Sequence, residues 1–382
     1  MLLKYGLRNF FGFREGAEVS FELPASVCSE YPNKDDVSYL LGVKGKNGAG
    51  KTNLLKALSF MGDFATSSFS DEPEDTIDID SYYSNNEPSA FYVEYKMYDV
   101  IYRYELECTE QRVLRETLFR KEKRLTKIIE RFDNSFETLI SELDSVRVVK
   151  LRNNASFIST IKHYDLLNID ALAHSYSFFN SILSNVHMFG MQTNQPDLSK
   201  VSQIYDSNEK YLEFAKNVIS NCDTGVDDIK IVQYSTREGV TEYAPLFERK
   251  INDKIEALTY FVESSGTKSL YLQLGKYKYI LDIGGILVLD EFDINLHPHI
   301  LPILLNLFTN EETNPKNSQL IFTTHDTEVL DLLGKYRTYF VDKVDNECYS
   351  YRLDEIPSDI LRKGRSMVPA YNAGKIGGIP RV

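Results

Sequence analysis

Apolar residues recur with two different periods along the chain, and the change of period separates its regions. Two alternating runs within residues 1–23 predict a pair of strands. A third apolar run, Tyr39–Val43, is followed by helix-like spacing over Lys51–Phe64. Over Ala90–Phe132, tyrosine and β-branched residues recur with period two, which predicts a β-meander.

Residues 135–224 change to helix-like spacing and predict a compact helical lobe. Its helices are expected near residues 135–147, 156–188 and 207–221. No sustained heptad pattern runs through them, which argues against a long coiled-coil arm.

Strand patterns return after this region, where Ile229–Tyr234 and Val240–Glu248 predict a hairpin. Further on, short apolar runs, typical of strands buried on both faces, alternate with helix-like segments. The strands are expected at Gly285–Glu291, Ser318–Thr323 and Thr338–Val341, and the helices at Lys268–Leu274 and Asp326–Leu333. The alternation predicts an α/β fold beside the antiparallel meander.

Composition narrows the class of protein. A chain of 382 residues can bury a sizeable core, as one large domain with an insertion or as two domains. Its net charge of −13 disfavours a broad, non-specific nucleic-acid surface. Four widely separated cysteines form no C-x-x-C pair, so we expect neither a zinc site nor a disulfide framework. Without a signal peptide or a run of about 18 apolar residues, the sequence predicts a cytoplasmic protein.

The strand Tyr39–Val43 leads into GKNGAGKT at residues 45–52, the pattern G-x-x-x-x-G-K-[ST] between a strand and a helix. Such a loop surrounds phosphate oxygens with backbone N–H groups at a helix N-terminus. Lys51 is expected to reach the β- and γ-phosphates, and the Thr52 hydroxyl to bind Mg²⁺. The sequence therefore predicts a site for a nucleoside triphosphate, formed by Asn47, Gly48, Ala49, Gly50, Lys51, Thr52 and Asn53.

Two of the predicted buried strands end in residues suited to phosphate chemistry. The first ends in Asp290 and Glu291, at the carboxyl end of a strand, where open α/β sheets bind ligands. Asp290 is expected to hold Mg²⁺, and Glu291 to orient or deprotonate the attacking water. His325, after the second strand, is expected to donate to the γ-phosphate. Alone, each is an ordinary strand end, but together with the phosphate loop they predict hydrolysis.

A turn of small polar residues, ESSGTKS at 263–269, opens one of the predicted helices. Taken together, the order GKNGAGKT, ESSGT, LVLDEFD and TTHD resembles the ATP-binding-cassette superfamily. The N-terminal segment NFFGF at 9–13 is similar to that of its SMC/RecF-type branch. The resemblance covers residues 1–60 and 255–342.

The resemblance implies an ABC-type P-loop ATPase head with an antiparallel β subdomain and an inserted compact helical lobe. It divides the chain into residues 1–132, the N-terminal half of the head with phosphate loop and meander; 133–226, the helical insertion; 227–354, the C-terminal half with signature, Asp290, Glu291 and His325; and 355–382, a basic, glycine-rich tail.

The same resemblance assigns residues by position. ESSGT stands in the place of the LSGGQ signature, so Ser264, Ser265, Gly266 and Thr267 would contact ATP held by a second copy of the chain. Thr267 replaces the glutamine of the family. Arg8 either faces the phosphates or is a surface charge, and the Q-loop glutamine is Gln111 or Gln192.

More narrowly, the chain resembles stand-alone ATPases of bacterial phage-defence and abortive-infection operons, such as RloB-associated and AriA-like proteins. This implies an ATP- and Mg²⁺-dependent switch that dimerises around ATP and gates a separate effector, a nuclease or toxin. It leaves nucleic acid open as a further partner and implies no membrane. The alternatives are a RecF-type clamp that grips DNA in repair, and a scaffold that binds ATP without turnover.

Three charged stretches each allow two interpretations. The acidic residues 71–80 form either a solvated loop or a docking strip for a basic partner. A basic cluster in the meander is either a solvated sheet edge or a phosphate contact strip. It consists of Arg120, Lys121, Lys123, Arg124, Lys127 and Arg131. The tail from Glu355 is either a disordered end or a docking peptide.

Overall fold

The computed structural model describes residues 1–382 except 167, 192–195, 223, 358–359, 362–363 and 379–382. The chain folds into two compact units. Unit 1 consists of Met1–Met191, Gly284–Phe292 and Asn317–Val382, and unit 2 of Gln192–Ile283 and Asp293–Lys316.

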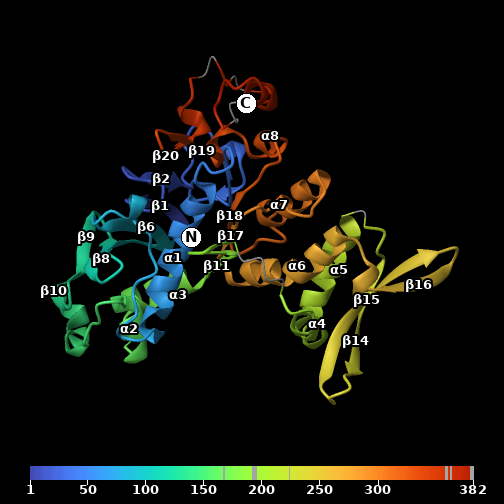
Figure 1. Cartoon of the computed structure of the whole chain (residues 1–382), viewed down its shortest axis with the longest axis horizontal. Coiled ribbons are helices and arrows are strands. Elements are labelled where there is room, and N and C mark those ends of the chain that lie inside the picture. The colour runs from blue at the N-terminus through green and yellow to red at the C-terminus, as the bar shows by residue number, and fades with distance from the viewer. Residues whose placement is uncertain (167, 192–195, 223, 358–359, 362–363, 379–382) are drawn as a thin grey trace. The chain divides into compact units, whose positions relative to one another are not determined.

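A six-stranded sheet forms the centre of unit 1, in the order β11-β17-β18-β5-β19-β20 (Figure 1). Its strands are β5 Leu40–Lys44, β11 Ile182–Ser184, β17 Ile286–Leu289, β18 Gln319–Thr323, β19 Thr338–Val344 and β20 Glu347–Arg352. Neighbouring strands are parallel except β20, which pairs antiparallel with β19. Every residue of β5, β17 and β18 is buried, as the uniformly apolar runs predict.

The predicted meander forms the second sheet of unit 1, in the antiparallel order β10-β9-β8-β7-β6-β1-β2. Its strands are β1 Leu2–Arg8, β2 Ala17–Ser20, β6 Ser89–Met97, β7 Val100–Cys108, β8 Val113–Lys121, β9 Leu125–Phe132 and β10 Ser135–Leu139. Burial alternates along β6 and β7, because successive side chains point to opposite faces. Helix α1, Lys51–Ser67, packs against strands of both sheets, and most of its residues are buried (Figure 1).

The stretch expected to form one helical lobe is divided between the two units. Helices α2, Phe157–His163, and α3, Asp170–Asn180, pack against α1 in unit 1. Helices α4, Leu198–Ser207, and α5, Glu209–Asn221, belong to unit 2. Residues expected to be helical near 135–139 and 182–184 form β10 and β11 instead. Both are sheet edges, where pairing with β9 and β17 outweighs weak local preference.

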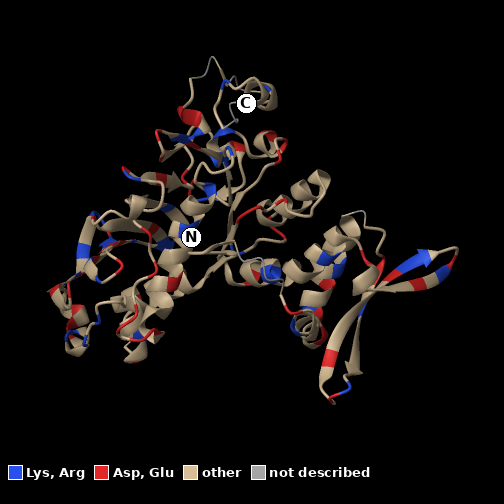
Figure 2. Ribbon diagram, in the orientation of Figure 1, with Lys and Arg blue, Asp and Glu red and all other residues tan. Residues whose placement is uncertain are grey.

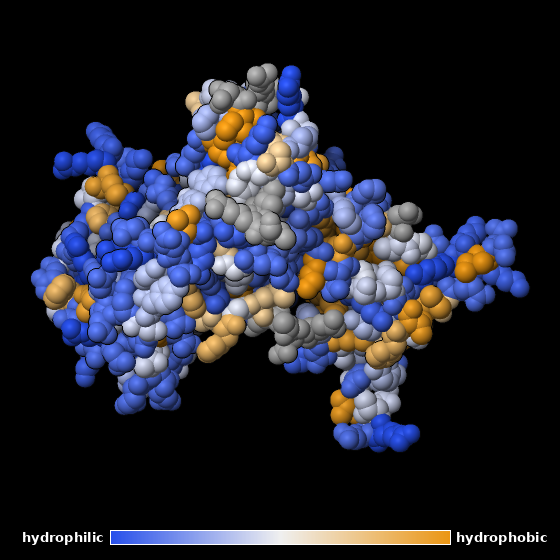
Figure 3. Space-filling model, turned by 45° about the horizontal axis from the view of Figure 1, so that its top comes forward, coloured by the Kyte–Doolittle hydropathy of each residue, from blue (hydrophilic) through white to orange (hydrophobic). Residues whose placement is uncertain are grey.

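Unit 2 combines helices with a small sheet. Helices α4 and α5 pack against α6, Ser265–Ile283, and α7 spans Leu301–Thr309. The predicted hairpin is confirmed as β14, Asp228–Ser235, and β15, Thr241–Ile251. A third strand, β16 at Lys254–Thr259, extends it, and all of its residues are exposed. Apolar residues stand among hydrophilic ones on the surface of this unit (Figure 3).

The described part of the C-terminal tail belongs to unit 1 and packs against its β19 and its α8, Val329–Leu333. Ile376 is buried in an apolar cluster with Leu330 of α8 and Phe340 of β19. A short helix, α9 at Val368–Asn372, precedes it. The described residues of the tail are therefore part of the fold. Its basic residues Arg362, Lys363 and Arg381 lie outside the described residues.

The basic cluster of the meander does not form one continuous strip. Arg120 pairs with Glu142 at 2.7 Å and Lys127 with Glu130 at 2.6 Å. Arg131 is fully buried, and its Nη1 lies 3.1 Å from Oε2 of the equally buried Glu116. Acidic residues are interspersed with basic ones along these strands (Figure 2).

Among the residues that the structure describes, no helix is both long and apolar enough to cross a membrane.

Candidate nucleotide-binding site

The phosphate loop connects the carboxyl end of β5 to the first residue of α1, as its sequence context predicts. Two of its glycines are required by space and backbone geometry. A Cβ added at Gly45 would lie 2.2 Å from the carbonyl oxygen of Val341. Gly50 adopts a left-handed conformation with φ of 107°, directly before the helix. The loop therefore presents a nearly bare backbone at the N-terminus of α1.

The Lys51 ammonium lies within the curve of the loop. Its Nζ donates to the carbonyl oxygens of Gly45, at 2.9 Å, and Lys46, at 3.2 Å. The residue is buried, with 8% of its surface exposed. These acceptors hold the charge in place beside the loop.

Thr52 and Asp290 meet although they are far apart in the sequence. Thr52 Oγ1 donates to Asp290 Oδ2 at 2.7 Å, and Thr323 Oγ1 donates to Asp290 Oδ1 at 2.5 Å. Asp290 is buried. A hydroxyl and a carboxylate are oxygen ligands of the kind that Mg²⁺ prefers, with phosphates and water completing the shell. Among the described residues, no three His, Cys, Asp or Glu side chains gather into a metal site of their own.

Glu291 follows directly and is partly exposed. Its backbone N–H donates to Thr323 Oγ1 at 2.8 Å, so Thr323 orients both acidic residues. Its φ of 50° is unusual for a residue other than glycine. Such backbone conformations concentrate at functional sites.

Asn185, which sequence reasoning missed, positions Asp290. The Asp290 N–H donates to Asn185 Oδ1 at 2.7 Å, and Asn185 Nδ2 donates to the Asp290 carbonyl oxygen at 3.0 Å. Asn185 follows β11, which the sequence predicted to be helical. The only available signal was Ile182-Leu183 between serines, a run too short to distinguish strand from helix.

His325 is exposed in the loop that follows β18. The buried Lys44 side chain, from the end of β5, holds this loop: its Nζ donates to the Asp326 carbonyl oxygen at 2.5 Å. Sequence reasoning did not identify Lys44, because a lysine in an apolar strand carries no motif.

The signature-like turn lies in unit 2 and begins α6. Ser264 Oγ accepts a hydrogen bond from the Thr267 N–H at 3.1 Å, which caps the helix. Ser264 and Ser265 are exposed, and Gly266 is partly exposed, but Thr267 is buried. Thr267 is therefore a buried structural residue of the turn, and the two serines are its accessible side chains.

The turn is anchored by the residue before it. Glu263 accepts two hydrogen bonds from Arg249 of β15, at 2.5 and 2.9 Å. Glu263 is buried, so this two-point ion pair fixes where α6 begins.

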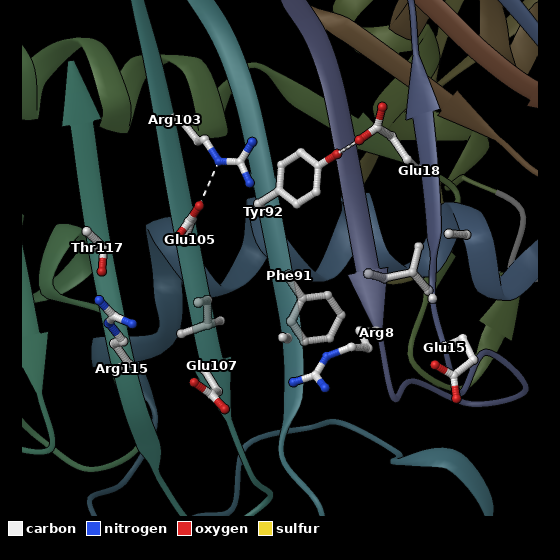
Figure 4. A pocket seen from close by; sticks show the side chains of 15 residues that line it. Arg8, Glu15, Glu18, Phe91, Tyr92, Arg103, Glu105, Glu107, Arg115 and Thr117 are labelled. Atoms are coloured by element: carbon white, nitrogen blue, oxygen red, sulfur yellow. Dashed lines mark hydrogen bonds and ion pairs between the residues drawn. The ribbon is translucent and has the colours of Figure 1, made fainter. Parts of the chain in front are cut away.

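Arg8 lines a hollow on the antiparallel sheet, together with Glu18, Tyr92 and Arg103 (Figure 4). The Arg103 guanidinium lies over the Tyr92 ring, 4.0 Å from its centre. No residue of the phosphate loop lines this hollow. Of the two Q-loop candidates, Gln111 is exposed after β7, and Gln192 lies outside the described residues.

Comparison with known proteins found a matching family model and solved structures of similar fold. Residues 40–331 match the model of the family described as "AAA domain, putative AbiEii toxin, Type IV TA system". The crystal structure of an Smc head bound to the C-winged helix domain of ScpA superposes with a TM-score of 0.50 at 13% identity, over 93% of this chain and 99% of that one. The SMC head domain from Thermotoga maritima gives 0.45 at 15% identity, over 92% and 98%. No curated protein sequence matches significantly.

The likeness to the Smc head confirms the predicted fold class, an α/β P-loop ATPase head of ABC type with an antiparallel sheet. The family match covers most of the chain, including the phosphate loop, the signature-like turn, Asp290 and His325. The chain therefore belongs to the family described as "AAA domain, putative AbiEii toxin, Type IV TA system", and its fold resembles that of an Smc head.

Proposed function

We propose that this chain is an ATP-hydrolysing switch, which closes as a dimer around ATP and gates a separate effector in defence against phage. The observation that carries hydrolysis is the convergence of Thr52, Asp290, Thr323 and Glu291 beside the phosphate loop. The defence role is supported by the abortive-infection family to which the chain belongs.

ATP would bind at the N-terminus of α1. Lys51 would exchange its two carbonyl acceptors for β- and γ-phosphate oxygens, and the backbone N–H groups of Asn47–Asn53 would surround the phosphates. Thr52 and Asp290 would hold Mg²⁺, which neutralises phosphate charge when bound.

Hydrolysis would depend on Glu291 and His325. The Glu291 carboxylate takes a proton from the water that attacks the γ-phosphorus, while the bond between that phosphorus and the β–γ bridging oxygen breaks to give ADP and phosphate. Thr323 fixes the Glu291 backbone and thereby orients the base. His325, exposed after β18, would donate to the γ-phosphate.

Dimerisation would use the signature-like turn of unit 2. Ser264 and Ser265 are exposed at the start of a long helix, where N–H groups attract anions. In our proposal they contact the γ-phosphate of ATP held by a second copy, and hydrolysis releases the contact. Opening and closing would then act on the effector, a nuclease or toxin in another chain.

The RecF-type alternative predicts turnover that rises on addition of DNA and falls steeply with salt. The net charge of −13 counts against it, as does the burial of Arg131, which removes one charge from the expected contact strip. DNA-stimulated hydrolysis by the purified chain would favour the clamp over the effector switch.

Replacing Lys51 by alanine should weaken ATP binding by about 10- to 100-fold, because hydrogen bonds from a charged donor contribute about 1.5–3 kcal/mol. The affinity can be measured with a fluorescent ATP analogue. Lys46→Ala is the matched control, since Lys46 lies in the same loop but pairs with Asp342 at 2.8 Å. Unchanged affinity of Lys51→Ala would refute the assignment of the loop.

Replacing Asn185 by alanine should lower kcat for ATP hydrolysis by about 10- to 100-fold, as is usual for residues that orient a metal ligand. KM for ATP should change little, because Asn185 holds Asp290 and does not belong to the loop. Asn185→Asp retains the acceptor for the Asp290 N–H and should recover part of kcat. Asn180→Ala, at the exposed end of α3, is the control. Equal losses in both alanine variants would contradict a positioning role.

A further inference from the structure

An acidic hollow of about 480 Å³ opens beside α1 in unit 1. It lies between the C-terminal half of that helix, the acidic loop 71–78, and the hairpin of β12, Val186–His187, and β13, Gly190–Met191. Its acidic lining residues are Asp63, Asp71, Asp75 and Asp78, and none of the described residues that line it is a lysine or an arginine. Burial and the nearby carboxylates of Asp75 and Asp78 raise the pKa of Asp71.

The lining includes a buried asparagine, Asn154, whose side-chain oxygen accepts no hydrogen bond from the described residues. Asn154 Nδ2 donates to the carbonyl oxygens of Glu72, at 2.7 Å, and Asp75, at 3.1 Å. These bonds fix the amide, and its buried Oδ1 has no hydrogen-bond partner in the part of the chain that the structure describes. Asn154 is only 4% exposed. The hollow thus combines four carboxylates with a buried amide whose oxygen accepts no hydrogen bond from the described residues.

The rim of the hollow carries an exposed aromatic side chain. Phe189, between β12 and β13, is 96% exposed and lines the hollow together with Met188. A fully hydrated phenyl ring beside a group of carboxylates suits a ligand that offers both apolar contact and positive charge. A single metal ion fits poorly, because these acidic groups do not gather into a metal site within the described residues.

The β12–β13 hairpin is connected through the chain to Asn185, which contacts Asp290 of the candidate ATP site. His187 Nδ1 lies 3.6 Å from Asp63 Oδ2, and His187 is two residues beyond Asn185. Asn185 clamps the Asp290 backbone at 2.7 and 3.0 Å. Just before it, Ser184 accepts a hydrogen bond from Ser59 of α1 at 2.6 Å. A cation that pairs with Asp63 would displace His187 from this carboxylate, and His187 belongs to the hairpin that follows Asn185.

We propose that the acidic hollow is a docking site for a lysine- or arginine-rich segment of a partner protein, whose binding alters ATP turnover through the hairpin and Asn185. The docking site is inferred from the hollow alone, whereas the effect of docking on ATP turnover rests on the proposed function. Charge complementarity selects the partner: an extended basic segment can meet several aspartates while an apolar neighbour contacts Phe189.

The test uses a fluorescein-labelled hexa-arginine peptide and the full chain without nucleotide, followed by fluorescence polarisation. The triple variant Asp71→Asn/Asp75→Asn/Asp78→Asn should bind at least tenfold more weakly than the wild type. A control variant removes the same charge at exposed sites elsewhere: Glu311→Gln/Glu312→Gln/Asp345→Asn. It should bind within twofold of the wild type. Phe189→Ser, which keeps all carboxylates, should weaken binding severalfold to an apolar-flanked peptide of the same charge.

Equal weakening in the triple variant and the control would overturn the docking site, because it would reflect net charge alone. A changed oligomeric mass of the triple variant, measured by light scattering, would identify a second copy as the occupant and also overturn the proposal.

The effect on turnover is measured separately. In the wild type the peptide should change the ATPase rate at least threefold, and in the triple variant it should not, while the rate without peptide stays within twofold of the wild type. Binding without any change in rate would overturn the coupling. If the chain does not hydrolyse ATP at all, the proposed function fails, and peptide binding still decides the docking site.

Discussion

Replacing Glu291 by glutamine is expected to lower ATP hydrolysis by about 10²- to 10⁴-fold, the usual contribution of general base catalysis. Glutamine keeps the shape of the side chain but cannot accept the proton of the attacking water. Thr323 still receives the backbone N–H of residue 291, so the site should keep its geometry. Because closure would need the γ-phosphate and opening its hydrolysis, the variant should accumulate as a dimer with ATP and Mg²⁺.

Phosphate release measures the rate, and light scattering measures the mass. Glu328→Gln is the control, because Glu328 is an exposed acid in the loop after β18; it should keep the wild-type rate and remain monomeric. Adding Lys51→Ala to Glu291→Gln should abolish the dimer. A Glu291→Gln variant that stays monomeric with ATP and Mg²⁺ would contradict the dimer proposal.

Replacing Arg131 by methionine should lower the free energy of unfolding by about 3–5 kcal/mol, the usual cost of removing one partner of a buried ion pair. Both side chains of the Arg131–Glu116 pair are fully buried. Tyr104 and the Phe157 N–H would still donate to Glu116, at 2.6 and 2.9 Å, but its charge would have no counterion. Arg131 also donates to the Ala155 carbonyl oxygen at 2.5 Å, which joins the meander to the segment before α2.

Urea unfolding followed by circular dichroism measures this loss. Arg120→Met removes an exposed pair with Glu142 and should cost at most about 1 kcal/mol. Adding Glu116→Gln to Arg131→Met should restore part of the stability, because no buried charge then remains unpaired. If Arg131→Met lowers the free energy of unfolding by less than Arg120→Met does, the buried pair does not stabilise the meander.

The sequence by itself predicted the parts of the site whose geometry is local. The phosphate loop follows from glycines between an apolar strand and a helix, since a backbone that must surround phosphates needs those residues at those spacings. The meander follows from period-two alternation because one face of each strand is buried. Asp290 and Glu291 were predicted because a uniformly apolar run ends in acids at the carboxyl end of a buried strand.

The tertiary structure alone decided which distant residues complete these parts. Asn185 and Lys44 carry no motif, and Thr323 belongs to the TTHD motif but received no role from it. Each of the three acts through contacts with residues far from it in sequence. Arg131 seemed to belong to a surface strip, because period-two alternation cannot tell a charged residue on the outer face from one paired inside. The helical stretch was divided because β10 and β11 gained pairing partners at sheet edges. Local propensity is worth tenths of a kcal/mol per residue, whereas burial and hydrogen bonding to distant strands are worth more, so long-range partners determine such positions.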